Sequence, residues 1–277
     1  MKILGVDFTS RPGPRKPIVA AIGSLDESGL AVDELRRFDA WPPFEAWLLE
    51  PGPWVGGFDF PFGLPRRFVD VVMPEADWVG LVARVGAMTR EAFCELTWPS
   101  FRDAKGRPEL KHREVDAFAR SHSPLKTMDP VRRVAVNPPV GLMFFEGAPR
   151  LLTAGVHVAG LHENGDPRVA LEAYPGALAR RLGARYYKND PQPRCEERRA
   201  ARRRLLERLA AGGESGIACR VAAALEREIV DDPSGAALDA VLCAAQAAWG
   251  ARLQAQRYGL PAQVDPVEGW IVGIARC

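Results

Sequence analysis

The alternation of apolar and polar positions in the first sixty residues predicts four strands and one short helix. The first apolar run is nearly continuous, as in a strand that is buried on both faces. The next two runs are separated by only a few turn-forming residues, and such short connections favour antiparallel neighbours. The strands are predicted at Lys2–Phe8, Ile18–Leu25, Leu30–Phe38 and Trp54–Phe60, and the helix at Phe44–Glu50.

The middle of the chain, residues 66–165, has a less regular pattern. Asp77–Leu96 and Lys111–Ser121 have helical spacing, whereas Gly141–Leu152 is predicted to be extended. Proline-rich stretches between these segments indicate loops. We therefore expect residues 66–165 to be an insertion or cap within a single domain that spans residues 1–277.

A regular α/β pattern returns after residue 165. One more strand is followed directly by a helix that begins with proline, and a later alanine-rich helix can pack closely against a sheet. Three antiparallel strands followed by α/β units predict a mixed sheet with helices on its faces. The predicted elements are the strand Arg168–Ala173, the helices Pro175–Leu182, Glu196–Ala211, Ile217–Ile229 and Ala237–Tyr258, and a final extended segment Glu268–Ala275.

The composition is that of a folded, water-soluble chain. Hydrophobic residues make up 47% and charged residues 26%, which supplies a packed core and excludes a disordered polymer. The 37 Lys and Arg residues nearly balance the 35 Asp and Glu residues, so net charge alone indicates no nucleic-acid surface. The five scattered cysteines form no C-x-x-C pair and are predicted to be free thiols. Without a leader-like segment or an apolar run of about 18 residues, we expect a cytoplasmic protein with no membrane span.

Two acids interrupt apolar runs at the points where strands give way to loops. Asp7 ends the first predicted strand, and Asp59 occupies the matching place in the fourth. If these strands are parallel neighbours, both carboxylates lie at the carboxyl edge of the sheet, where open α/β sheets bind their ligands. Carboxylates this close repel each other, and a divalent cation keeps both ionised. Oxygen ligands favour Mg²⁺, Mn²⁺ or Ca²⁺ over zinc.

Two later acids extend this candidate site. Glu172 stands near the end of the strand predicted after residue 165, and Asp239 lies near the start of the alanine-rich helix. Each has a structural alternative, which is a salt bridge to a nearby arginine for Glu172 and a favourable interaction with the helix dipole for Asp239. Turn capping is the corresponding alternative for Asp7 and Asp59.

Four segments of the chain resemble one protein family when they are taken in order. They are GVDFTS, GFDFPFGLP, EAYPGALAR and ALDAVLCAAQAAW. Together they resemble the predicted RNase H-like nucleases grouped as domain of unknown function 429, over roughly residues 1–65 and 165–277. The resemblance implies an α/β fold of the RNase H-like type. Its mixed five-stranded sheet would have three antiparallel strands, then two parallel strands, with an acid on a C-terminal helix.

The same resemblance implies roles for individual residues. Asp7, Asp59 and Asp239 would bind the metal, and Glu172 matches a further acid of the family. Holliday-junction resolvases, which have a similar helix, often carry a polar residue three positions before this helical Asp, where the present chain has Ala236. Asp232 is therefore an alternative ligand.

The implied activity is phosphodiester hydrolysis by a metal-dependent nuclease. Mg²⁺ or Mn²⁺ would be the cofactor, nucleic acid the partner, and the four acids the catalytic residues. Thr9 and Ser10, in the turn after the first strand, are candidates for contacting a phosphate, with ordinary turn residues as the alternative.

Two other functions stay open. In a phosphotransferase of related fold, GVDFTS would hold the phosphates of ATP, although the motif occurs once and no second glycine-rich phosphate loop is present. In a binding or regulatory module, the fold would persist without catalysis.

Basic residues concentrate in one predicted helix. Such a surface can follow a nucleic-acid backbone, but three glutamates of the same helix partly neutralise it, and an ordinary solvated helix is the alternative. Lys126, Arg132 and Arg133 are a second candidate patch. The arginines of the helix are Arg198, Arg199, Arg202, Arg203, Arg204 and Arg208.

Overall fold

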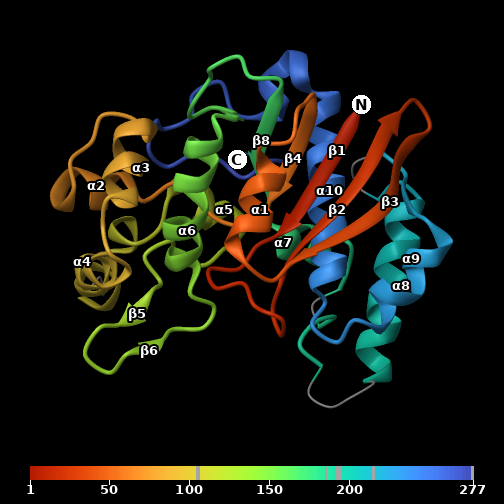
Figure 1. Cartoon of the computed structure of the whole chain (residues 1–277), viewed down its shortest axis with the longest axis horizontal. Coiled ribbons are helices and arrows are strands. Elements are labelled where there is room, and N and C mark those ends of the chain that lie inside the picture. The colour runs from red at the N-terminus through yellow and green to blue at the C-terminus, as the bar shows by residue number, and fades with distance from the viewer. Residues whose placement is uncertain (104–106, 185, 191–194, 214–215, 276–277) are drawn as a thin grey trace.

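A seven-stranded mixed sheet forms the centre of the molecule (Figure 1). Its strands are β1 (Lys2–Asp7), β2 (Ile18–Asp26), β3 (Gly29–Phe38), β4 (Trp54–Phe58), β7 (His157–Val158), β8 (Arg168–Glu172) and β9 (Cys219–Val221). They lie in the order β7-β8-β4-β1-β2-β3-β9, with β1, β2 and β3 antiparallel and the other pairs parallel. The computed structural model describes residues 1–103, 107–184, 186–190, 195–213 and 216–275.

The sequence predicts five of these seven strands, and the expected count of five is wrong. The two additional strands lie at the edges and contain only two and three residues, too few for a hydrophobic period. β7 pairs with β8 and β9 pairs with β3, so both satisfy backbone groups that an edge would leave open. β9 lies inside the predicted helix Ile217–Ile229, and that helix instead begins at Ala223 as α9 (Ala223–Asp231).

The alanine-rich helix α10 (Ala236–Arg252) packs against one face of the sheet. Gly5 of β1 and Gly57 of β4 are neighbours in register and both face this helix. A Cβ atom on Gly5 would lie 2.1 Å from the carbonyl oxygen of Ala240, and one on Gly57 would lie 2.4 Å from the carbonyl oxygen of Cys243. The two glycines therefore bring the helix backbone directly onto the strands that carry the first two candidate acids.

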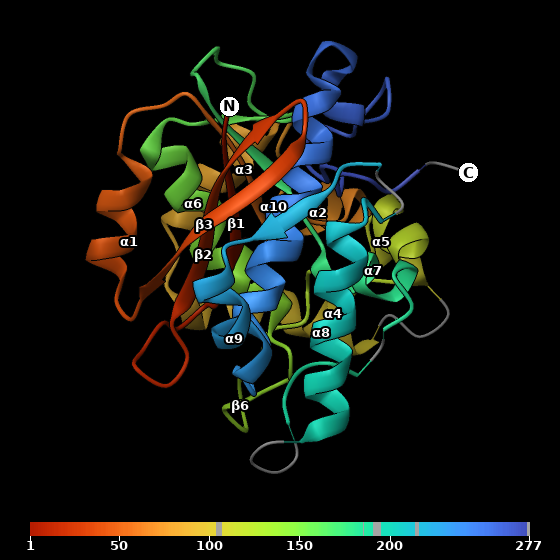
Figure 2. The same cartoon turned by 90° about the vertical axis from the view of Figure 1, so that its right-hand side faces the viewer.

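The opposite face of the sheet is covered by most of the central block, residues 66–165, whereas Val115 and Ala119 of this block pack in the cluster on the α10 side. Val6 and Phe58 of the sheet belong to the same hydrophobic cluster as Phe144 and Leu151 of α6 (Val140–Ala154). Figure 1 shows α6, α3 (Trp78–Gly86) and α4 (Arg90–Asp103) on this side, whereas Figure 2 shows α8 (Glu196–Ala210) and α9 beside α10. The central block thus shares its hydrophobic core with the sheet.

Helix α6 corrects the prediction of extended structure for Gly141–Leu152. Its buried residues recur every three or four positions, as on one face of a helix. Two glycines and a proline weaken this signal in the sequence. Gly147 is required by packing, because a Cβ atom there would lie 2.6 Å from the ring of Phe60.

The remaining elements follow the predicted order with local differences. The predicted helix Asp77–Leu96 is divided between α3 and α4, and the predicted helix Ala237–Tyr258 ends at Arg252, before the 3₁₀ helix η2 (Gln254–Gly259). The tail Glu268–Ala275 forms turns and a single bridge to β8 rather than a strand. The other elements are α1 (Trp41–Leu48), α2 (Arg66–Val72), η1 (Pro108–Leu110), α5 (Glu114–Ala119), β5 (Met128–Asp129), β6 (Val134–Ala135) and α7 (Pro175–Arg181).

Two further expectations concern the described residues as a whole. Within the described ranges, no helix combines the length and apolarity that a membrane crossing needs. Cys94, Cys195, Cys219 and Cys243 are free thiols, and Cys277 lies outside the described residues.

Candidate metal centre

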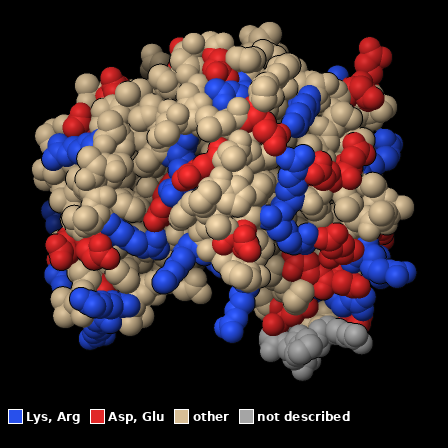
Figure 3. Space-filling model, in the orientation of Figure 1, with Lys and Arg blue, Asp and Glu red and all other residues tan. Residues whose placement is uncertain are grey.

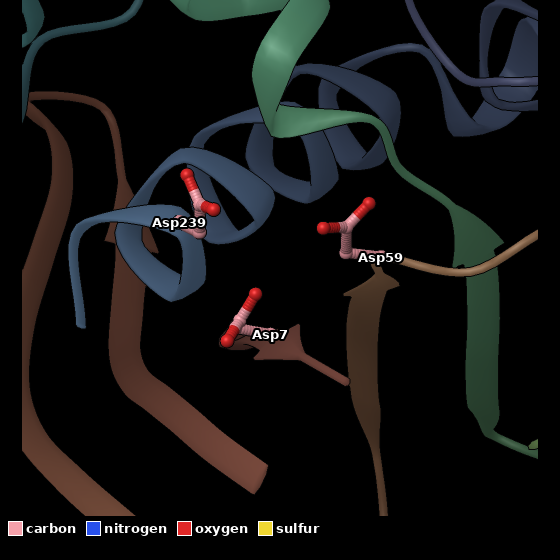
Figure 4. A group of neighbouring side chains, drawn as sticks. All are labelled: Asp7, Asp59 and Asp239. Atoms are coloured by element: carbon pink, nitrogen blue, oxygen red, sulfur yellow. The ribbon is translucent and has the colours of Figure 1, made fainter. Parts of the chain in front are cut away.

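Three aspartates that are far apart in the sequence meet at the carboxyl edge of β1 and β4. β4 runs parallel to β1, and the backbone N–H of Asp59 donates to the carbonyl oxygen of Val6 at 2.9 Å, which places Asp59 beside Asp7. Asp239 faces them from the first turn of α10. Each aspartate offers a carboxylate oxygen within 4.8 Å of the other two (Figure 4). The structure therefore brings together the three residues that were predicted as metal ligands.

The electrostatics of this aspartate cluster are strained in the absence of a cation. Burial raises the pKa of Asp7 well above its ordinary value, and the charges of Asp239 and Asp59 raise it further. Burial likewise raises the pKa of Asp59, to about 7. The positive charges of Lys188 and Lys16 act in the opposite direction on both aspartates. A bound dication would relieve the same repulsion more strongly.

The three carboxylates differ in their hydrogen bonds. Asp239 accepts one hydrogen bond at Oδ1 from the hydroxyl of Tyr187, at 2.5 Å, and another at Oδ2 from Nζ of Lys188, at 2.6 Å. No group of the described ranges donates to the carboxylate of Asp7 or Asp59. No completely buried side-chain nitrogen or oxygen in these ranges lacks a partner, so the oxygens of Asp7 and Asp59 are accessible. Two carboxylates therefore keep their lone pairs available for a ligand.

Lys188 is the lysine in direct contact with the aspartate cluster, and sequence reasoning did not find it. It lies 51 residues before Asp239, in the loop between α7 and α8, where no hydrophobic period fixes its position. Burial alone would lower the pKa of Lys188, but Asp239 and Asp59 outweigh burial and raise it. The ammonium group therefore stays charged beside the aspartate cluster.

Glu172 lies on the other face of the sheet. It is the register partner of Phe58, whose ring belongs to the hydrophobic cluster opposite α10. Arg113 binds both of its carboxylate oxygens, at 2.7 and 2.8 Å, and the backbone N–H of Phe62 donates to it at 2.9 Å. The structural alternative predicted for Glu172, a salt bridge to an arginine, is what the structure shows, and Glu172 does not join the aspartate cluster.

The other predicted positions have structural partners as well. Thr9 and Ser10 are buried, and the carbonyl oxygen of Ser10 accepts a hydrogen bond from Arg90 at 3.0 Å. Their burial leaves little surface for a phosphate. Asp232 accepts the backbone N–H of Ala237 at 2.9 Å, so it stabilises the start of α10 and does not reach the aspartate cluster.

Most arginines of α8 bind other groups of the protein, although only Arg202 among them is buried. Arg202 is fully buried, donates to the carbonyl oxygen of Tyr187 at 2.7 Å and pairs with Asp190. Arg198 donates to the carbonyl oxygen of Lys188. The helix that was considered as a nucleic-acid surface thus holds the loop that carries Tyr187 and Lys188.

Comparisons with known proteins place the whole of this site within one family. Searches of curated proteins and of solved structures found no match. The family model described as "Protein of unknown function (DUF429)" matches residues 5–264, which include the three aspartates, Lys188 and the central block. The chain therefore belongs to the DUF429 family.

Proposed function

We propose that this protein hydrolyses phosphodiester bonds of nucleic acid with a divalent metal ion, Mg²⁺ or Mn²⁺, held by Asp7, Asp59 and Asp239. The observation that carries the proposal is that the cluster has more carboxylates than groups that neutralise or hydrogen-bond them. Three carboxylates converge, one lysine pairs with one of them, and two accept no hydrogen bond from the described residues. Leaving such charges partly buried without compensation costs several kcal/mol, roughly, and a cation removes that cost.

The donor set suits these two ions. All three ligands are carboxylate oxygens, which hard divalent cations prefer, and the cluster contains none of the imidazole or thiolate ligands that favour zinc. When bound, such an ion would supply an activated water and stabilise the negative charge that develops in the displacement. The three aspartates would position this chemistry at the sheet edge.

Lys188 has a separate part in this proposal. Its side chain is partly exposed, and its ammonium group carries a positive charge next to Asp239. It would donate a hydrogen bond to a non-bridging oxygen of the substrate phosphate and stabilise the negative charge that develops there. Tyr187 would hold the other oxygen of Asp239 in place.

The strand order supports the finer proposal of an RNase H-like fold. The five central strands lie in the order β3-β2-β1-β4-β8, with three antiparallel strands followed by two parallel ones, as the family resemblance implies. One acid ends β1, one follows β4 and one lies in the first turn of α10, which are also the implied places. The burial of Thr9 and Ser10 gives less support to a phosphotransferase, whose first turn would contact ATP.

Cleavage of labelled substrates in Mn²⁺ tests the proposal. The panel contains single- and double-stranded DNA, RNA, an RNA–DNA hybrid and a branched junction. We expect the wild-type protein to cut at least one of them and Asp7→Asn to lose at least 100-fold in rate while staying folded. Asp33→Asn, an exposed aspartate of β3, is the matched control and should cut as the wild type does. Full activity of Asp7→Asn would contradict the proposal.

A further inference from the structure

The loop between β1 and β2, residues 8–17, is a basic segment that follows Asp7 directly. It carries Arg11, Arg15 and Lys16 and no acid, whereas the whole chain has a net charge of only +2. All three side chains belong to exposed residues, and no ion pair to them is found among the residues that the structure describes. A local charge of +3 without acidic partners is suited to bind an anion.

This loop is held close to the aspartate cluster. Asp7 is the register partner of Val19, so the loop begins directly after Asp7 and ends beside it, and Lys16 stands three residues before that partner. Arg90 of α4 fixes the start of the loop through the carbonyl oxygen and hydroxyl of Ser10, at 3.0 and 3.4 Å. Two backbone hydrogen bonds between Gly13 and Lys16, at 3.0 and 3.2 Å, close its tip. The basic loop is therefore preformed, which lowers the entropy cost of binding.

A second basic segment, residues 126–133, leads into and around the β5–β6 hairpin. Arg132 and Arg133 are exposed. The one acid of the segment, Asp129, accepts the backbone N–H groups of residues 131 and 132 and forms a long ion pair with Arg132, at 3.9 Å. Helix α4 links this segment to the basic loop, because its Thr97 shares a hydrogen bond with Thr127 at 3.0 Å and its Arg90 donates to the carbonyl oxygen of Ser10 at 3.0 Å.

Both segments lie on one side of the molecule. Figures 1 and 2 show the red loop that follows β1 and the β5–β6 hairpin toward the same lower side. Figure 3 shows Lys and Arg side chains reaching into a hollow on that side, between the part that carries β5 and β6 and the part that carries α8. Asp and Glu side chains border the hollow on the side that carries α8, so its cations lie mainly toward the part that carries β5 and β6.

We propose that residues 8–17 and 126–133 form the binding surface for the sugar–phosphate backbone of a nucleic-acid strand, which they hold on the two flanks of the phosphodiester at the aspartate cluster. The surface rests on the proposed function for its purpose, because it would deliver the strand to the metal. It replaces α8 as the nucleic-acid surface, since the arginines of α8 mostly bind groups of the protein itself. A chain with a net charge near zero thus concentrates its available cations where a strand would pass.

Binding of a fluorescent 20-nucleotide single strand, measured by anisotropy in EDTA at several salt concentrations, tests this surface. Without metal, the signal depends on contacts of the strand with the protein and not on cleavage. The first variant combines Arg11→Gln, Arg15→Gln and Lys16→Gln, and the second combines Arg132→Gln and Arg133→Gln. The matched control is Arg203→Gln with Arg204→Gln, two exposed arginines of α8.

Each lost phosphate contact lowers the slope of log K against log salt by about 0.7 for a single strand. We therefore expect the slope to fall by about 2 in the loop variant and by about 1.4 in the hairpin variant, with affinity at least tenfold weaker in the loop variant. The α8 control should keep the wild-type slope. Unchanged slopes in the two segment variants, or an equal fall of the slope in the control, would contradict the proposed binding surface.

Mn²⁺ binding, measured by electron paramagnetic resonance, separates this inference from the proposed function. If wild type binds Mn²⁺ through Asp7 and cuts nucleic acid while the segment variants bind the strand normally, the surface is wrong and the function stands. If the segments bind the strand but Asp7→Asn leaves Mn²⁺ affinity unchanged, the function is wrong and the surface stands.

Discussion

Two groups of acids, one partly buried and one buried, lie on opposite faces of the same sheet, and their charges are compensated in opposite ways. On the α10 face, the aspartate cluster has three carboxylates and one lysine in direct contact with it. On the other face, Arg113 lies between Asp116 and Glu172, and each of these carboxylates has donors at both oxygens. We call Arg113, Asp116 and Glu172 the arginine network.

The difference separates a binding site from a structural contact. The arginine network is saturated, because Ser121 and the backbone N–H of Phe62 also donate to its carboxylates. A further ligand would have to displace these donors. The aspartate cluster is unsaturated, and Asp7 and Asp59 gain partners only from a ligand. Burial, partial or complete, is therefore common to both groups of acids, and the shortage of donors distinguishes the functional candidate.

The largest effect is expected when the arginine network is broken at its centre. Arg113→Met leaves two buried carboxylates without their cation, which destabilises a protein by about 3–5 kcal/mol. Urea unfolding of the wild-type and variant proteins measures the loss. Replacing the acids as well, by Asp116→Asn and Glu172→Gln in the Arg113→Met background, should restore part of it, and Arg203→Met on the surface of α8 should change little. A loss of stability below 1 kcal/mol would show that Arg113 does not compensate the charges of Asp116 and Glu172.

The aspartate cluster should respond to pH in the opposite sense to a stabilising salt bridge. The pKa of Asp59 is raised to about 7 in the folded protein, whereas it is near 3.8 in an unfolded chain. Between these values the folded state binds the proton more tightly, so the free energy of unfolding of the metal-free protein should fall as pH rises from about 4 to about 7. One pKa unit corresponds to about 1.4 kcal/mol.

Unfolding curves in EDTA and in saturating Mg²⁺ check this pH dependence. The metal favours the ionised carboxylates, so it should remove most of the fall, and Asp59→Asn should remove it without metal. Subtracting the pH profile of Asp59→Asn removes the contributions of the other titrating groups. If the difference in the free energy of unfolding rises between pH 4 and 7 in EDTA, the raised pKa of Asp59 is contradicted.

The same comparison shows how far the sequence leads. Asp7 and Asp59 were predictable because each ends an apolar strand, and parallel pairing then places them together. The side-chain period of two could also have excluded Glu172, since Leu171 faces α10 and the next residue must face away. The sequence prediction grouped Glu172 with Asp7 and Asp59 because all three lie at strand ends, and it did not apply this alternation.

Lys188 and Arg113 could not be predicted in the same way. Both reach their acids from loop or cap positions in segments that are distant in the sequence, with separations of 51 and 59 residues. No local period connects such residues. The edge strands β7 and β9 were missed for a related reason, since two or three residues pair only because the sheet beside them already exists.

Removal of the Lys188 ammonium group should raise the affinity for Mn²⁺ and lower the rate of cleavage. In Lys188→Met, Asp239 loses a competing cation, so Mn²⁺ should bind several-fold more tightly. Cleavage should nevertheless slow by about 100-fold, because the phosphate loses a charged donor. Lys188→Arg, which keeps the charge, should recover part of the rate. Weaker Mn²⁺ binding in Lys188→Met would show that the lysine supports the cluster only as a structural contact.

The smallest effect is expected at Asp232, the alternative ligand. Its replacement tests whether the metal site extends beyond Asp7, Asp59 and Asp239. Its carboxylate accepts the backbone N–H of Ala237 and the hydroxyl of Ser234, so it acts on the start of α10. Asp232→Ala should cost about 1 kcal/mol of stability, as other losses of helix-start contacts do, and leave Mn²⁺ affinity within twofold of the wild type. Because α10 also carries Asp239, a loose first turn would first appear as a small fall in Mn²⁺ affinity at elevated temperature. A tenfold or larger loss of Mn²⁺ affinity at 25 °C would instead show that Asp232 is a fourth metal ligand. The start of α10 would then belong to the metal site and not only support it.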